Sequence, residues 1–168
     1  MELLAKVVTV SDSVSAGAAK DRGGPAVTDV LEAQGFRIVD RRCTPDGKDA
    51  VSDCLLEMAE GFAGLIVTTG GTGFSPRDLT PEGTEAVLDR RAPGLAEAMR
   101  SVSPLGRLSR AVAGMIGPAL IVNVPGSPTG AVECLEAILD VIPHALELLG
   151  GGLPHGHSSS GGGADPVA

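Results

Sequence analysis

Short apolar runs alternate with amphipathic segments along most of the chain, and this pattern predicts strands alternating with helices. Apolar runs at residues 3–10, 65–69 and 119–123 have the length and composition of strands buried on both faces of a parallel sheet. Further strands are expected at residues 36–40 and 111–113. This order of segments predicts an α/β fold in which helices cover both faces of a mostly parallel sheet.

Amphipathic segments separate these strands, and each begins with residues that favour the start of a helix. Asp46, followed by Asp49, has the form of an N-cap with an acid in the first turn, so local physics gives Asp46 a structural role. A capping hydroxyl is expected at Thr80, and the last helix is expected to be bent or interrupted at Pro143. The expected helices begin at Pro25, near Asp46, and at Thr80, Leu95 and Ser127.

Loops of small and polar residues follow three of the predicted strands. These loops contain Ser11 and Asp12, residues 70–73, and residues 125–127. In open parallel sheets, ligands bind beyond the carboxyl ends of the strands. We therefore expect the three loops to meet at one edge of the sheet and to form the binding site.

The amino-acid composition argues against nucleic acids and membranes as binding partners. The chain carries 13 Lys and Arg against 21 Asp and Glu, a formal net charge of −8, which argues against binding to a nucleic-acid backbone. The absence of Trp and Tyr leaves little to stack on bases. No apolar run approaches the ~20 residues needed to cross a membrane, and no secretory signal is visible, so a cytoplasmic location is expected. Attraction for an anionic ligand would have to come from local features.

The length of 168 residues suits one domain, which we expect at residues 1–150. Residues 151–168 consist mainly of Gly, Ser, His and Pro, and we expect them to form a disordered tail. Cys43, Cys54 and Cys134 are widely spaced and lack a C-x-x-C pattern, which favours reduced thiols in or near the core.

The glycine-rich loop is a candidate phosphate site. Gly70, Gly71 and Gly73 lack side chains where backbone N–H groups could approach a phosphate, and Thr72 adds a hydroxyl donor. The alternative is that these glycines only permit a tight turn between a strand and a helix, and spacing alone leaves both interpretations open. The loop is neither a Walker A sequence nor a dinucleotide fingerprint.

Further candidates follow two of the strands. Asp78 could hold a magnesium ion against a phosphate, and Arg77 could contact anionic oxygens, although these residues alone favour a turn-forming acid beside a solvated arginine. Pro125, Gly126 and Ser127 form a second backbone-rich anion site or an ordinary turn capped by Ser127.

Several of these segments occur in a characteristic order, and together they resemble the molybdopterin adenylyltransferase family, which includes bacterial MogA and MoaB and the G domain of gephyrin. The resemblance extends over residues 5–150. The segments that carry it are TVSDSVSAG at 9–17, DR at 21–22, TPD at 44–46, TTGGTGFSPRDLTPE at 68–82, APG at 92–94, LSR at 108–110, NVPGS at 123–127 and EC at 133–134.

The resemblance implies a three-layer α/β/α molybdopterin-binding fold that assembles as a trimer. The implied reaction is the magnesium-dependent transfer of AMP from ATP to the terminal phosphate of molybdopterin in molybdenum cofactor biosynthesis, with release of diphosphate. A molybdenum-insertion enzyme is an implied partner. Asp46 and Asp78 become the essential acids near the metal and the phosphates, and the implied binding residues are Ser11, Asp12, Gly70, Gly71, Thr72, Gly73, Arg77, Pro125, Gly126 and Ser127.

Two other functions remain compatible with the sequence. A related molybdenum-insertion or competence-damage type of domain shares the implied fold, although its glycine loop tends to lack the residue equivalent to Gly73. A non-catalytic molybdopterin carrier or scaffold could keep the same pocket without turnover. The presence of both Asp46 and Asp78 favours the enzyme.

Overall fold

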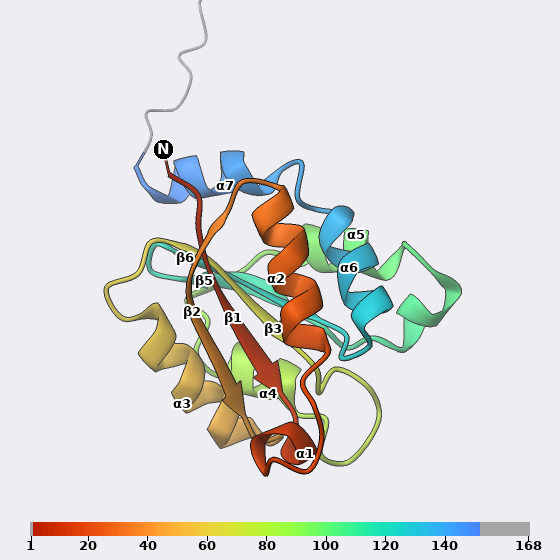
Figure 1. Cartoon of the computed structure of the whole chain (residues 1–168). Helices are drawn as coiled ribbons and strands as arrows, with labels where there is room; N and C mark the ends of the chain where they lie inside the picture. The colour runs from red at the N-terminus through yellow and green to blue at the C-terminus, as the bar shows by residue number, and fades with distance from the viewer. Residues whose placement is uncertain (1, 152–168) are drawn as a thin grey trace, which may run out of the picture.

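Four neighbouring parallel strands form the centre of the sheet (Figure 1). The computed structural model describes residues 2–151. The strands are β1 (Leu4–Val10), β2 (Arg37–Thr44), β3 (Gly64–Thr69), β4 (Arg90–Arg91), β5 (Ala113–Ile116) and β6 (Ala119–Val124). Their order is β2-β1-β3-β6-β5-β4, and β5 runs antiparallel to both of its neighbours. The predicted mostly parallel sheet is therefore confirmed.

Helices cover both faces of this sheet. They are α1 (Asp12–Ser15), α2 (Gly23–Ala33), α3 (Lys48–Ala59), α4 (Thr80–Glu85), α5 (Pro93–Arg100), the 3-10 helix η1 (Pro104–Leu108), α6 (Pro128–Glu136) and α7 (Ile142–Leu149). Helices α2, α5, α6 and α7 pack on one face, and α3 packs on the other with α4 beside it (Figure 1). This is the expected three-layer α/β/α arrangement.

Side chains of β1 show why the sheet needs helices on both sides. Val7 belongs to the core under α2 and α6, whereas Val8 belongs to the core under α3, and both are buried. Burying a valine side chain contributes about 1.5–3 kcal/mol, so a strand that carries valines on both of its faces favours a fold in which helices cover both sides of the sheet.

The helix starts differ from prediction in an informative way. Ser127 caps α6 as expected, because its Oγ accepts a hydrogen bond from Gly130 N at 3.1 Å. Asp46 is not an N-cap, since α3 begins after Gly47 without a side-chain cap and the Asp46 carboxylate accepts from Asp12 N instead. The Thr80 hydroxyl is not a cap either, because it donates to Gly70 O at 2.8 Å. Both wrongly predicted caps belong to the loop cluster at the strand ends.

Some strand and helix boundaries also differ from the predicted ones. The strand expected at 111–113 begins only at Ala113. The interruption expected at Pro143 is confirmed, because α6 ends at Glu136 and Pro143 lies in the first turn of a separate α7. Helix α1, strand β4 and η1 were not predicted. Cys134 is buried and Cys54 partly buried, but the placement of Cys43 in or near the core is wrong, since edge strand β2 exposes it.

Two further predictions concern the C-terminal tail and membrane-spanning segments. Apart from Gly151, the predicted tail at 151–168 lies outside the described residues. Over residues 2–151, the structure has no helix that is both long enough and apolar enough to cross a membrane.

Candidate functional site

The three loops expected to form the site do meet, because β1, β3 and β6 are neighbours in the sheet. A polar cavity of about 400 Å³ lies where these strands end. Both acids, Asp46 and Asp78, line it. Of the other predicted binding residues, Ser11, Gly70, Gly71 and Gly126 line the same cavity.

Gly70 and Gly71 lie where the backbone conformation and the close neighbouring atoms leave no room for a side chain. Gly70 has φ +109°, and a Cβ there would lie 2.2 Å from Val10 O. Gly71 has φ +66°, and a Cβ there would lie 2.3 Å from Thr80 Oγ1. Within residues 2–151, the amides of Gly71, Thr72 and Gly73 donate no hydrogen bond. Three neighbouring N–H groups are therefore available to an anionic ligand.

The two acids lie against this loop. Asp46 Oδ2 accepts from Asp12 N at 2.8 Å, and Asp46 Oδ1 lies 3.1 Å from the position of a Cβ on Gly71. Asp78 Oδ2 accepts from Ser75 N at 2.9 Å and lies 2.9 Å from the position of a Cβ on Gly73. In the described part of the chain, Oδ1 of Asp46 and Oδ1 of Asp78 accept no hydrogen bond. Each acid therefore keeps one oxygen for a ligand.

Arg77 and Asp12 hold these loops together. Arg77 Nε and Nη2 each donate to the Asp12 carboxylate at 2.9 Å, and Nη2 also donates to Asp46 O at 2.8 Å. The hydrogen bonds from Arg77 hold the pKa of Asp12 below its ordinary value. Neither residue lines the polar cavity. The structure thus gives Arg77 protein partners where the sequence suggested ligand oxygens.

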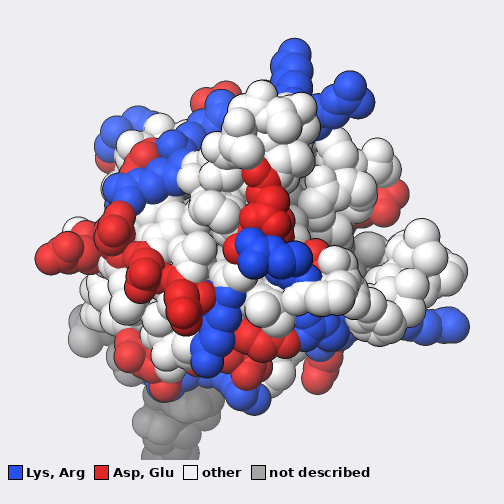
Figure 2. Space-filling model, turned by 90° about the horizontal axis from the view of Figure 1, so that it is seen from below, with Lys and Arg blue, Asp and Glu red and all other residues white. Residues whose placement is uncertain are grey.

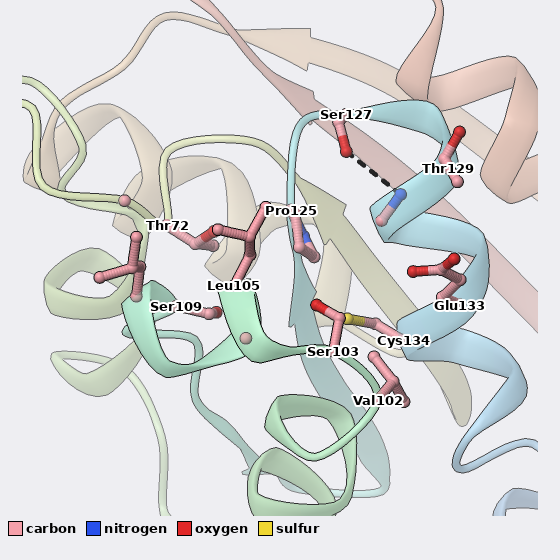
Figure 3. A pocket seen from close by; sticks show the side chains of 14 residues that line it. Thr72, Val102, Ser103, Leu105, Ser109, Pro125, Ser127, Thr129, Glu133 and Cys134 are labelled. Atoms are coloured by element: carbon pink, nitrogen blue, oxygen red, sulfur yellow. Dashed lines mark hydrogen bonds between the residues drawn. The ribbon is translucent and has the colours of Figure 1, made fainter.

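A second cavity of about 420 Å³ adjoins the same loops (Figure 3). Thr72, Gly73, Pro125 and Ser127 line it, together with apolar residues near η1 and residues of α6. Glu133 is the one charged residue among the lining residues that the structure describes. The segments 70–73 and 125–127 contribute to both cavities, but with different residues: Gly70, Gly71 and Gly126 line the polar cavity, whereas the others line the second.

Comparison with known proteins identifies the family. Residues 6–144 match the family described as "Probable molybdopterin binding domain". The chain belongs to this molybdopterin-binding family. A molybdopterin adenylyltransferase from Helicobacter pylori is 38% identical over 150 residues, which cover 85% of each chain. The molybdopterin adenylyltransferase of Escherichia coli is 35% identical over 165 residues, covering 86% of this chain and 84% of that one.

The fold agrees with solved structures of the molybdopterin-binding family. The crystal structure of the molybdopterin biosynthesis enzyme MoaB from Thermus thermophilus superposes with a TM-score of 0.84. It is 45% identical in sequence, and the match covers 89% of this chain and 97% of that chain.

Sequence reasoning missed part of the polar cavity in this family member. Asp21 was not among the predicted site residues, but Lys20, Asp21 and Arg22 all line the cavity. Asp21 Oδ1 accepts from Gly24 N at 2.9 Å, and Oδ2 accepts from Thr9 Oγ1 at 2.8 Å. An acid three residues before a glycine at the start of α2 was the available signal, because side chains in that position accept from first-turn amides.

Charge on the face at the strand ends is mixed. Figure 2 looks along the sheet onto this end and shows Lys and Arg intermingled with Asp and Glu, without separation into two large patches. Among residues 2–151 no group of three metal-ligating side chains is present. Two carboxylates suit Mg²⁺, which is often held by one or two carboxylates together with the phosphates of a substrate.

Proposed function

We propose that the protein is a molybdopterin adenylyltransferase, which transfers AMP from ATP to the terminal phosphate of molybdopterin in molybdenum cofactor biosynthesis. The observation that carries the proposal is a pair of cavities lined by successive residues of one glycine loop, Gly70 and Gly71 in the polar cavity and Thr72 and Gly73 in the second. Two ligands that lie in these cavities can bring their phosphates together at the glycine loop. The names of the Helicobacter and Escherichia relatives support the same reaction.

The polar cavity suits phosphate groups. Gly71 lines it with an amide that donates no hydrogen bond within residues 2–151, and Lys20 and Arg22 supply positive charge. The amides of Thr72 and Gly73, which also donate none in that part of the chain, follow directly on the same loop. Among the residues that the structure describes, Glu133 is the single charged residue in the lining of the neighbouring cavity, so this cavity suits an uncharged ring system better than a phosphate. The site as a whole thus matches substrates that combine a heterocycle with phosphates.

The reaction needs little acid–base chemistry. A terminal phosphate oxygen of molybdopterin attacks the α-phosphorus of ATP, a new P–O bond forms, and the bond to the β-phosphate breaks with its electron pair leaving on diphosphate. A phosphate monoester is already largely ionised at pH 7, with a second pKa of about 6, so no strong base is required. Alignment and stabilisation of charge by the loop amides would supply most of the catalysis.

Magnesium fits the donor set. Asp46 and Asp78 would hold the ion through the oxygens that accept no hydrogen bond within the described residues. When bound, Mg²⁺ neutralises charge on the phosphates. Asp12 and Arg77 hold Asp46 in place in this proposal, Ser11 and Gly126 help line the phosphate region, and Pro125 and Ser127 help bind the ring system.

The remaining features of the proposal come from the sequence and from the family resemblance. We expect one catalytic domain over residues 1–150, a homotrimer, a cytoplasmic location, and transfer of the adenylylated product to a molybdenum-insertion enzyme. Size determination in solution tests the trimer, because a monomeric protein would contradict it.

The test of function combines binding with turnover. Protein, Mg²⁺, ATP and molybdopterin are mixed, and adenylylated molybdopterin and diphosphate are measured. Formation of both products supports the enzyme. Tight binding of molybdopterin without either product would contradict it and favour a carrier.

A further inference from the structure

Five carbonyl groups fix the loop between β3 and α4, and two residues hold all five. Thr80 Oγ1 donates to Gly70 O at 2.8 Å, and Thr80 N donates to Gly71 O at 3.1 Å. Arg110 N donates to Thr72 O at 2.9 Å, and Arg110 Nε donates to Gly73 O at 2.9 Å. Arg110 Nη2 donates to Asp78 O. Arg110 therefore contacts the loop at both ends of the segment from Thr72 to Asp78.

These contacts also set the direction of the N–H groups. A peptide unit is planar and its C=O and N–H point in opposite directions, so holding one carbonyl orients the amide of the following residue. The carbonyls of Thr72 and Gly73 both accept from Arg110, and the amides of Gly73 and Phe74 consequently point away from it. An arginine on a distant part of the chain thus orients backbone donors of the loop.

The guanidinium group is itself held in place. Arg110 Nη1 donates to Glu82 Oε1 on α4, and the side chain is about two-thirds buried, with 34% of its surface exposed. Burial raises the pKa of Glu82, but the hydrogen bond and charge of Arg110, together with a backbone hydrogen bond and the charge of Lys48, hold that pKa below its ordinary value. All three guanidinium nitrogens are used in a fixed planar fork, which a lysine ammonium does not reproduce.

We infer that Arg110 is a positioning residue that orients the amide of Gly73 at the end of the glycine loop and holds Asp78 for adenylyl transfer. The inference rests on the proposed function. Arg110 lies outside the lining of both cavities and acts through the carbonyls of Thr72, Gly73 and Asp78. Its effect should therefore fall on turnover more than on the affinity for substrates.

Arg110→Lys tests this role, with Arg100→Lys as a matched control. Arg100 is also partly buried, and its Nη1 donates to one backbone carbonyl, that of Ala111, without touching the glycine loop. We expect R110K to lower kcat about 10- to 100-fold, in the range of misplacing a catalytic group, with a much smaller change in KM. R100K should keep kcat within about twofold, because the loop stays in place.

Amide hydrogen exchange supplies a readout that does not depend on turnover. In R110K the peptides covering residues 72–79 should exchange faster than in R100K, with unchanged exchange in β1 and β3. Unchanged exchange in residues 72–79, or wild-type kcat in R110K, would overturn the inference. So would an equal loss of kcat in both variants, which would indicate general destabilisation. Absence of turnover in the wild-type protein would instead refute the proposed function, and the exchange comparison would still decide the role of Arg110 in the loop.

Discussion

Asp12 and Asp46 exchange two hydrogen bonds between backbone and side chain. Asp12 N donates to Asp46 Oδ2 at 2.8 Å, and Asp46 N donates to Asp12 Oδ1 at 3.1 Å. The pair joins the loop after β1 to the loop after β2, and Arg77 extends it to the loop after β3. Asp46 is therefore held by two other segments of the site and not by the helix that follows it.

Removal of Arg77 should raise the pKa of Asp12. Arg77 lowers that pKa from the value of 3.8 for an ordinary aspartate, so the pair stabilises the fold above this pH and the effect is lost as pH falls through the lower folded-state pKa. In Arg77→Gln, the loss of Tm relative to wild type should be present at about pH 6 and shrink below about pH 4. NMR titration of the Asp12 carboxyl checks the shift, and an unchanged pKa in R77Q would contradict the role of the pair.

Asp78→Asn should strongly reduce adenylyl transfer without unfolding the protein. The asparagine oxygen can still accept from Ser75 N, so the turn is retained, but the negative charge beside the glycine loop is lost. Turnover should fall by about 10²- to 10³-fold, the range seen when one charge-stabilising group is removed. Asp53→Asn, at an exposed position of α3, makes the same change of charge away from the site and should keep wild-type turnover. Wild-type rates in D78N would refute its assignment.

Gly71→Ala should lower the free energy of unfolding more than Gly61→Ala, which serves as the control for backbone strain alone. Both glycines have positive φ, +66° and +62°, but only the added Cβ at Gly71 meets other atoms, Thr80 Oγ1 at 2.3 Å and Asp46 Oδ1 at 3.1 Å. G61A has only the strain, about 1–2 kcal/mol. G71A should lose about 1–3 kcal/mol more, because it displaces the Thr80 hydroxyl from Gly70 O, and should also lose turnover. Equal unfolding free energies for the two variants would show that the glycine loop is not tightly packed.

A buried polar network behind the loop should be a major source of stability. Asn123 Nδ2 donates to Thr68 Oγ1 at 2.8 Å and to Thr84 Oγ1 at 3.0 Å, and Asn123 Oδ1 accepts from Val112 N at 3.2 Å. Asn123→Ala removes every one of these bonds and should lower the free energy of unfolding by about 2–4 kcal/mol. Thr68→Val keeps the shape and removes one bond, so it should lose only about 0.5–1.5 kcal/mol in chemical denaturation. A larger loss in T68V than in N123A would contradict this ranking.

Much of the fold was predictable because its signals are local. The apolar runs of β1, β3 and β6 fix the central parallel strands, and Ser127 marks the start of α6 as expected. Short elements such as α1 and the two-residue β4 carry too few residues to produce a pattern. The N-cap prediction for Asp46 failed because its actual partner, Asp12, lies 34 residues away in the chain.

The candidate site was predictable only in part. Strand ends and glycines pointed to residues 70–73 and 125–127, and the parallel order of β1, β3 and β6 brings them together. The contribution of Asp21 and the three-carbonyl contact of Arg110 were not predictable from local sequence. Arg110 follows Gly73 by 37 residues, and its role depends on how the segment after η1 passes the glycine loop.

The central claim is best tested by following labelled ATP in the presence of Mg²⁺ and molybdopterin. With label on the α-phosphate, the account predicts that the label appears in the molybdopterin product. With label on the γ-phosphate, it predicts that the label leaves in diphosphate. Transfer of the γ-label to molybdopterin, or bound molybdopterin that acquires no label from either position, would contradict adenylyl transfer at this site.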